Sequence, residues 1–371
     1  MTLALASITA IVLGQQRSTK SQRPGDDGPA LKAQINAPSS LALDADGDIY
    51  VYESIGGAIR RIDGSTHRIT TVAKECGDPP SQKPTPTGCF GSISGLLVMD
   101  SGNLLFSEFT YNRVSSYNPV SHRFTVIGGN GDLTSSGDGG QARDAGLTVP
   151  HCLTLNYNGD IFVCDSSHFI RRIDANTGII STVAGSGKRG YAGDGGPALK
   201  AQFVTPLSVA VDRQGNIFVA DDTSNRIRRV DAHTGIIETY AGIGAVSPAR
   251  VPPFSGEGGP AVAAGIPSPG SLVLDREGNL FFLTANRVCR IDRLTGILSS
   301  VAGVGQDGYS GDGGPATSAR IGPVDLAVDS HGNLFIAEFE NNRIRRIDAK
   351  TGIITTVAGN GLPHRPPAAI L

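Results

Sequence analysis

Short apolar runs separated by polar turns follow one another along almost the whole chain. In one stretch they are Leu207-Ser-Val-Ala-Val211, Asn216-Ile-Phe-Val-Ala220, Asn225-Arg-Ile-Arg-Arg-Val-Asp231 and Ile236-Ile-Glu-Thr-Tyr240. Turns rich in Gly, Asp and Asn lie between them, and these residues tolerate the backbone conformations that tight turns need. Runs of this length that are rich in Val, Ile and aromatic residues are typical of β-hairpins. The pattern therefore predicts a unit of four short antiparallel strands.

This unit recurs six times. Its first turn ends in a glycine followed by Asn or Asp, and these glycines, 54 to 63 residues apart, are Gly47, Gly102, Gly159, Gly215, Gly278 and Gly332. A near-constant period indicates a repeat architecture. A linear solenoid would need atypical polar repeats at its ends, which the sequence lacks, whereas radial closure leaves no long sheet edge exposed. We predict an all-β, six-bladed β-propeller of four-stranded antiparallel blades.

A second recurring segment connects the units. Its best copy is Gly193-Asp-Gly-Gly-Pro-Ala198, and further copies begin at Gly25, Gly137, Gly256 and Gly311. Proline after a capping acid and glycines is typical of a helix start, so we predict a short helical turn over Pro197–Gln202, capped by the acid. The second unit carries instead a proline-rich segment between Cys76 and Cys89.

Together these motifs resemble the NHL repeats of β-propellers, in the bacterial style whose fourth strand ends Ile-Ile-Thr-Thr-Val-Ala-Gly, as at Ile353–Gly359. The resemblance covers residues 25–361 and implies one propeller domain. Related propellers bind proteins, sugars or RNA, or act as lyases and lactonases. The fold alone therefore leaves the function open.

The two ends lie outside the repeats. Residues 1–14 have the length of a signal-peptide apolar core but carry no Lys or Arg before it, and Ile8–Gly14 also matches the fourth-strand pattern. An N-terminal strand and a signal remnant both stay open. We assign residues 1–24 to this segment and its polar linker, and residues 362–371 to a C-terminal tail. Whether the chain is a fragment of a larger protein also stays open.

Charge and composition narrow the partners. The formal net charge is −2 and only 18% of residues are charged, which argues against the concentrated basic face that nucleic acids require. Apolar runs stay short of the roughly 18 residues that a membrane-spanning helix needs. The sequence thus favours a protein or carbohydrate ligand and leaves the oligomeric state undetermined.

Five cysteines form a pattern of their own. If Leu155 faces Ile161 across a hairpin, counting outward places Cys152 opposite Cys164, where a cross-strand disulfide fits. A second disulfide between Cys76 and Cys89 would close the proline-rich loop, and Cys289 is left over. Disulfides favour an exported protein, and unpaired thiols in a reducing cytosol are the alternative.

Enzymatic propellers gather their catalytic groups at the central channel. The equivalent positions at the channel mouth hold Ser39, His151, Leu207, Gly270 and Val324, with the second unit unassigned. Amidating-lyase propellers, which resemble this family, hold zinc with three Pro-His pairs, and a catalytic zinc needs three protein ligands. Pro150-His151 is the one match. Lactonase-like propellers use an acid and Asn/Asp cluster on calcium, for which Asp325 would be the candidate, without evident partners.

Most conspicuous charges are copied from repeat to repeat, so architecture explains them. Acids end five of the second strands, namely Glu53, Glu108, Asp165, Asp221 and Glu338. Arginine pairs occupy four third strands, namely Arg60-Arg61, Arg171-Arg172, Arg228-Arg229 and Arg345-Arg346. We expect each acid to pair with a third-strand arginine or to accept from loop amides, because an unpaired buried charge is costly. We expect the arginines to pair between blades.

Positions where the repeats disagree are the better functional candidates. Two are insertions, the Cys76–Cys89 loop with Lys83 and the 245–254 segment ending in Phe254. The others are loop aromatics, Phe109, Tyr111 and Phe339. Exposed aromatic loops on a rigid scaffold commonly hold a partner.

We therefore interpret the chain as a non-catalytic binding or scaffold propeller that presents loops and a channel mouth, including His151 and Asp325, to a protein or carbohydrate. No cofactor and no metal are expected, and an extracytoplasmic or secreted location is favoured. The alternatives are a metal-dependent lyase or lactonase-like enzyme at the channel, and an RNA-binding NHL propeller.

Overall fold

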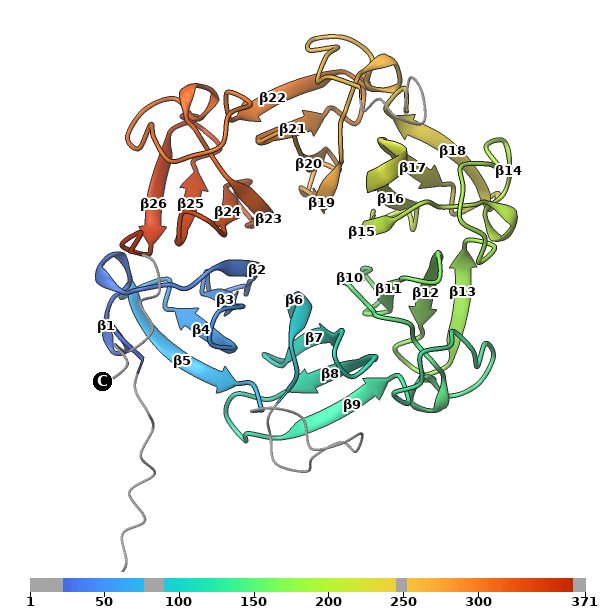
Figure 1. Cartoon of the computed structure of the whole chain (residues 1–371), viewed down its shortest axis with the longest axis horizontal. Helices are drawn as coiled ribbons and strands as arrows, with labels where there is room; N and C mark the ends of the chain where they lie inside the picture. The colour runs from blue at the N-terminus through green and yellow to red at the C-terminus, as the bar shows by residue number, and fades with distance from the viewer. Residues whose placement is uncertain (1–22, 77–89, 245–251, 363–371) are drawn as a thin grey trace, which may run out of the picture.

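Six antiparallel sheets stand around a central channel, and the chain visits them in order (Figure 1). The computed structural model describes residues 23–76, 90–244 and 252–362. Each sheet runs from an inner strand at the channel to an outer strand at the rim. The predicted six-bladed β-propeller is confirmed.

The four strands of each blade follow the predicted pattern. In blade four they are β15 (Pro206–Val211), β16 (Ile217–Asp221), β17 (Arg226–Val230) and β18 (Ile236–Ala241). Blade one has β2 (Pro38–Leu43), β3 (Ile49–Glu53), β4 (Ala58–Ile62) and β5 (Arg68–Lys74); blade two has β6 (Ile93–Val98), β7 (Leu104–Glu108), β8 (Arg113–Tyr117) and β9 (Phe124–Gly128). Blade three has β10 (Cys152–Leu155), β11 (Ile161–Asp165), β12 (Phe169–Ile173) and β13 (Ile180–Ala184). Blade five has β19 (Gly270–Leu274), β20 (Leu280–Thr284), β21 (Arg287–Ile291) and β22 (Leu298–Ala302); blade six has β23 (Pro323–Val328), β24 (Leu334–Glu338), β25 (Arg343–Ile347) and β26 (Ile354–Ala358).

The turn between the first two strands shows why Asp and Gly recur there. The Asp212 carboxylate accepts hydrogen bonds from the backbone amides of Gln214 and Asn216, at 2.9 and 2.8 Å. Gly215 has a φ of 86°, in the left-handed region that glycine enters without a steric penalty. The side chain therefore closes the turn that the glycine permits.

The hydrophobic core is divided into layers between neighbouring blades. The layer between blades one and six, for example, joins Val51 and Ile62 to Phe335 and Ile344, all of them buried. Five further clusters of this kind lie around the ring. Each blade is thus stabilised by apolar contacts on both of its faces.

The ring closes by packing and a few backbone hydrogen bonds. Blades one and six each take their four main strands from one continuous part of the chain. The amides of Gly359 and Asn360 donate to the carbonyls of Ala30 and Ala33, both at 3.0 Å. In the described part of the chain, no strand is exchanged between the first and last blades. The predictions for residues 1–14 lie outside the described residues.

The connectors run along the rim before they enter the next blade. Two form short edge strands, β1 (Gly28–Pro29) on β5 and β14 (Gly196–Pro197) on β18. A 3₁₀ turn follows in five connectors: η1 (Ala30–Lys32), η2 (Ala142–Asp144), η3 (Ala198–Lys200), η5 (Ala261–Ala263) and η6 (Ala316–Ser318). A sixth turn, η4 (Asp222–Ser224), follows β16. The predicted helical turn is therefore present.

The predicted acid cap is wrong. The N-cap of η3 is Pro197, and no side chain bonds to it. The connector acid instead pairs with a buried arginine of the third strand, as in Asp194–Arg228 at 2.6 Å. A guanidinium with no exposed surface requires a carboxylate more strongly than a single turn of helix requires a cap.

The repeated acids and arginines are architectural, as expected. Glu53 pairs with Arg60 at 3.0 Å, and Asp221 accepts from the amides of Val204 and Thr205. Equivalent arginines pair with Asp26, Asp138 and Asp312 of the connectors. The expectation of pairing between blades needs correction, since each arginine pairs within its own blade and with the connector leading into it.

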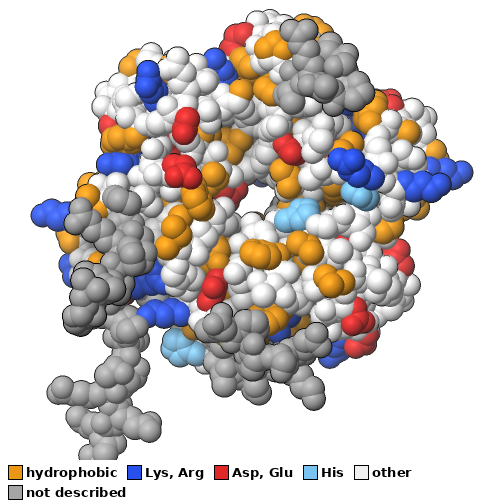
Figure 2. Space-filling model, viewed as in Figure 1, with side chains coloured by type: hydrophobic (Ala, Val, Ile, Leu, Met, Phe, Trp, Pro, Cys, Tyr) orange, Lys and Arg blue, Asp and Glu red, His pale blue; other side chains and the backbone are white. Residues whose placement is uncertain are grey.

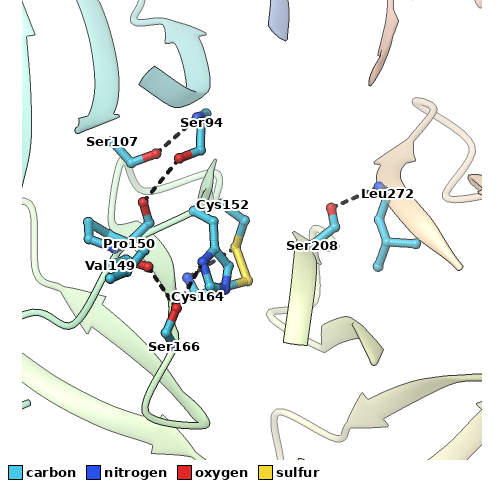
Figure 3. Close-up of a disulfide and its surroundings, with 11 residues drawn as sticks. Ser94, Ser107, Val149, Pro150, Cys152, Cys164, Ser166, Ser208 and Leu272 are labelled. Carbon is cyan, nitrogen blue, oxygen red and sulfur yellow. Dashed lines mark hydrogen bonds between the residues drawn. A yellow bond between two sulfur atoms is a disulfide. The ribbon is translucent and has the colours of Figure 1, made fainter. Parts of the chain in front are cut away.

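The predicted disulfide between Cys152 and Cys164 is confirmed (Figure 3). The two residues are direct partners in the β10–β11 ladder, with Cα atoms 5.0 Å apart. Cys289 is a free, buried thiol. The second predicted bridge depends on Cys89, which lies outside the described residues and stays a prediction.

Candidate functional site

The central channel forms a hollow through the middle of the propeller. Its volume is about 570 Å³, and inner-strand residues of all six blades line it. Figure 2 shows the opening at the centre of one face. The register Pro206↔Asp221 in blade four sets the start of the inner strand beside the loop that follows the second strand. We call this end of the ring the channel-mouth face.

Six equivalent residues surround the mouth. The five predicted positions line the channel, and Ser94 fills the unassigned position in blade two; the full set is Ser39, Ser94, His151, Leu207, Gly270 and Val324. One of the six is a histidine, so the zinc-lyase arrangement of three imidazoles is not formed here. No group of three or more His, Cys, Asp or Glu that could hold a metal ion occurs among the described residues.

His151 is held by blade three. Its Nδ1 lies 3.2 Å from the Ser166 hydroxyl, which also donates to the Val149 carbonyl at 3.1 Å (Figure 3 shows the latter bond). Burial lowers the pKa of His151, against the opposing effect of the Asp165 charge. The Nε2 atom is buried without a hydrogen-bond partner. The neutral imidazole is thus a partly exposed polar group in the channel lining.

The Asp325 side chain forms hydrogen bonds to both neighbouring blades. Its carboxylate accepts from the Leu41 amide of blade one at 2.9 Å and from the Ser271 hydroxyl of blade five at 2.7 Å. Burial raises the pKa of Asp325, and these hydrogen bonds oppose the shift. In this way the side chain bridges blades on both sides of its own.

Serines form the equivalent inter-blade hydrogen bonds in blades four and five. The Ser208 hydroxyl accepts from the Leu272 amide at 2.9 Å (Figure 3), and the Ser271 hydroxyl accepts from the Leu326 amide at 3.0 Å. Asp325 therefore replaces a serine in a belt of inter-blade hydrogen bonds. His151 stands in blade three, on the opposite side of the ring from Asp325 (Figure 1). The two candidates do not form one cluster.

Apolar side chains gather around the mouth. Leu207 and Val324 on the inner strands are 39% and 43% exposed, and Ile55 and Phe109 in the loops after the second strands are 44% and 43% exposed. Phe339 lies in the equivalent loop of blade six and is half-buried. We call these five residues the apolar rim. Scattered exposed apolar residues are ordinary, whereas large contiguous apolar patches are often interaction sites.

Sequence reasoning found part of this rim. Phe109 and Phe339 were predicted to bind, and the structure brings their loops to the same face. Ile55, Leu207 and Val324 were not proposed as binding residues. Leu207 and Val324 occupy two of the channel-mouth positions that the repeat pattern predicts, so the sequence could have identified them as binding residues.

The remaining predicted residues are placed elsewhere. Tyr111 stacks under Arg113, whose guanidinium carbon lies 4.7 Å from the ring centroid. Phe254 lies in the connector before blade five, where Arg287 stacks on it at 4.8 Å. Both rings are therefore engaged in packing. Lys83 lies outside the described residues.

The fold and this site define the class: a six-bladed β-propeller whose channel has a mixed polar and apolar lining, with an apolar rim at its mouth. Comparison with known families gives the same class more narrowly. The Teneurin NHL domain model matches residues 119–192 and 187–253, and the NHL repeat model matches residues 321–347. These matches support the NHL-repeat β-propeller family for this chain.

Relatives are distant in sequence and similar in fold. Teneurin-1 of Mus musculus is 27% identical over 92% of this chain, and the chain spans 13% of the length of that teneurin. A solved protein of unknown function from Bacteroides thetaiotaomicron is 19% identical, with a TM-score of 0.63 over 88% of this chain and 72% of that one. An auxiliary nutrient binding protein from Bacteroides ovatus is 14% identical, with a TM-score of 0.59 over 90% and 72%.

No helix among the described residues is long and apolar enough to cross a membrane.

Proposed function

We propose that this chain is a binding or scaffold propeller whose apolar rim holds a protein or carbohydrate partner at the channel-mouth face. The observation that carries the proposal is the rim itself, four of whose five side chains are 39% to 44% exposed around one opening. Aromatic and aliphatic side chains on a rigid scaffold are the usual anchors of a binding site. The partner would cover the mouth and contact His151.

The channel chemistry supports binding more than catalysis. Both carboxylate oxygens of Asp325 are occupied by hydrogen bonds that join blades. His151 has a lowered pKa and has Ser166 rather than a carboxylate beside its Nδ1. A general base needs a partner that orients and stabilises its protonated form. Neither residue meets that requirement.

The exported location is part of the same proposal. A cross-strand disulfide persists in an oxidising compartment. The chain is similar in sequence to teneurins and in fold to auxiliary nutrient binding proteins. The name of the second group describes a binding function, which agrees with the proposal.

The test is a comparison of two opposite faces. The double variant Phe109→Ser/Phe339→Ser removes rim anchors, and Tyr157→Ser is the matched control, because Tyr157 is 86% exposed in a turn at the other end of the strands. Both proteins are screened on arrays of exported proteins and of glycans beside the wild type. We expect ligands of the wild type to lose at least about tenfold in affinity for the rim variant and to keep their affinity for the control. Equal retention by all three proteins would contradict the rim as the site.

A further inference from the structure

The connectors of blades four and six each place a tyrosine against one buried and one half-buried arginine. In blade four, Tyr191 stacks with Arg226 and Arg228, whose guanidinium carbons lie 3.7 and 4.9 Å from the ring centroid. The Tyr191 hydroxyl donates to Asp194 at 2.7 Å and lies 2.8 Å from the Thr239 hydroxyl. Two arginines, an aspartate and a threonine thus form a socket for one phenol ring.

Blade six repeats this arrangement. Tyr309 stacks with Arg343 and Arg345 at 3.8 and 5.0 Å. Its hydroxyl donates to Asp312 at 2.9 Å and lies 3.2 Å from the Thr356 hydroxyl. Blades four and six thus share the same contacts around a tyrosine, whereas the equivalent position holds Phe254, stacked with Arg287, in blade five and Arg23, paired with Glu53, in blade one.

Blade three keeps the socket and lacks the tyrosine. Tyr191 stands two residues before Gly193, and the residue two before the equivalent Gly137 is Ser135. Three of the four polar partners remain: Arg171 pairs with Asp138 at 2.7 Å, and Thr182 faces Arg171 in the β12–β13 ladder as Thr239 faces Arg228. The fourth, Arg226, is replaced by Phe169 at the start of β12. A cavity of about 400 Å³ occupies the place of the ring, lined by Ser135, Asp138, Phe169, Arg171 and Thr182 among others.

One polar group of this cavity lacks a partner, since the hydroxyl of Ser186 is buried without a hydrogen bond. The Nε of Arg171 is also unpaired, as is that of Arg228 in blade four, so this atom does not distinguish the two blades. The Asp138 side chain is 51% exposed, against 33% for Asp194, which the tyrosine of its blade covers. Ser135 does not fill the space, since its hydroxyl turns inward to Asp165. A stacked ring would also cover the Arg171 guanidinium, which gains from an aromatic face.

We propose that this blade-three socket binds a tyrosine side chain supplied by a partner protein. The ring stacks on Arg171 against Phe169, and the hydroxyl donates to Asp138 and accepts from Thr182. The site lies at the outer edge of the propeller, beside the third and fourth strands of blade three. It shares no residue with the apolar rim of the channel-mouth face.

The sister sockets indicate that the tyrosine comes from a polypeptide. They remain open to solvent with the ring in place, because Tyr191 and Tyr309 are 39% and 40% exposed. A ring can therefore enter from outside while its own main chain stays on the surface. Leu199 lines the blade-three cavity and is 56% exposed, which gives a bound peptide an apolar contact beside the socket.

Titration of the full chain with two probes, p-cresol and the capped tripeptide acetyl-Gly-Tyr-Ala-amide, tests the proposal. The readout is the backbone amide chemical shifts of Phe169, Thr182 and Ser186. We expect saturable shifts in the roughly millimolar range that suits such small ligands, with the tripeptide at least as tight as p-cresol.

Ser135→Tyr fills the socket, so it raises the melting temperature and weakens both probes at least about tenfold. Tyr191→Ser opens a second socket and doubles the number of p-cresol sites.

Thr182→Val keeps the shape of the wall and removes one hydroxyl. It is expected to weaken p-cresol and to leave the binding of toluene, which has no hydroxyl, unchanged. Probe binding that is insensitive to Ser135→Tyr and Thr182→Val would overturn the site. Binding of p-cresol with rejection of the tripeptide would overturn the protein partner, because a free phenolic compound would then be the ligand.

Discussion

At the scale of single residues, sequence comparison between repeats identifies the unusual positions but not their roles. Asp325 stands out because the equivalent residues are serines in blades one, four and five and Gly95 and Cys152 in blades two and three. A lone acid beside a channel suggests metal or acid–base chemistry. The structure shows it accepting an inter-blade hydrogen bond as Ser208 and Ser271 do. A repeat position constrains which bond is made, and several side chains can make it.

Substitution at Asp325 separates the two interpretations. Asp325→Ser keeps an acceptor for the Leu41 amide and removes a buried charge, so we expect a stability equal to or above that of the wild type. Asp325→Ala leaves the amide unpaired and is expected to cost about 1–3 kcal/mol. The free energy of unfolding, measured with urea, distinguishes the variants.

The stability difference between Asp325→Ser and the wild type should depend on pH. Burial raises the pKa of Asp325 above 3.8. The carboxyl group therefore stays protonated to a higher pH in the folded state than in the unfolded state. Stability from this group is present below that value and is lost as the pH rises through the folded pKa. The advantage of Asp325→Ser should therefore grow as the pH rises. A serine variant as unstable as the alanine variant would contradict the belt role.

At the scale of elements, strands, turns and the matched acid–arginine positions follow from local patterning. Blade five shows that the match is mutual: where the second strand ends in Thr284 instead of an acid, the third strand carries Cys289 instead of arginine. Both side chains are buried. The capping acid was misassigned because its partner, Arg228, lies 34 positions further along the chain and is reached only in the folded blade.

A double-mutant cycle in blade four tests this coupling. Arg228→Cys alone leaves Asp194 and Asp221 without their cation and is expected to cost about 3–5 kcal/mol. Adding Asp221→Thr copies the blade-five pair, so the double variant should be more stable than additivity predicts by about 1 kcal/mol or more. Arg229→Ala is the control, since Arg229 is 31% exposed and should change stability by less than about 1 kcal/mol. Strict additivity would show that the charges are independent.

At the scale of the whole molecule, the ring has one junction without a connecting segment of chain. Blades one and six meet through the layer that contains Phe335 and through the Gly359–Ala30 and Asn360–Ala33 hydrogen bonds. Every other pair of neighbouring blades is also joined covalently. We therefore expect opening of the ring to begin at this junction.

Matched cavities at two junctions test this expectation. Phe335→Ala and Phe218→Ala remove equivalent second-strand rings that are 7% and 5% exposed, and each should cost about 3–5 kcal/mol. Amide hydrogen exchange should accelerate throughout blades one and six in the first variant and stay local in the second. The same pattern of exchange in both variants would argue against the junction as the weak point.

The sequence by itself determined the number of blades, the strands of each, the Cys152–Cys164 pair and the types of residue that must meet in the core. These follow from alternation, turn chemistry and register, which act over a few neighbouring residues. The tertiary structure decided which groups meet between blades: Asp325 with Leu41, Asp194 with Arg228, and the apolar rim around one opening. It also revealed the blade-three socket, because a missing tyrosine is visible only where its partners still surround the space.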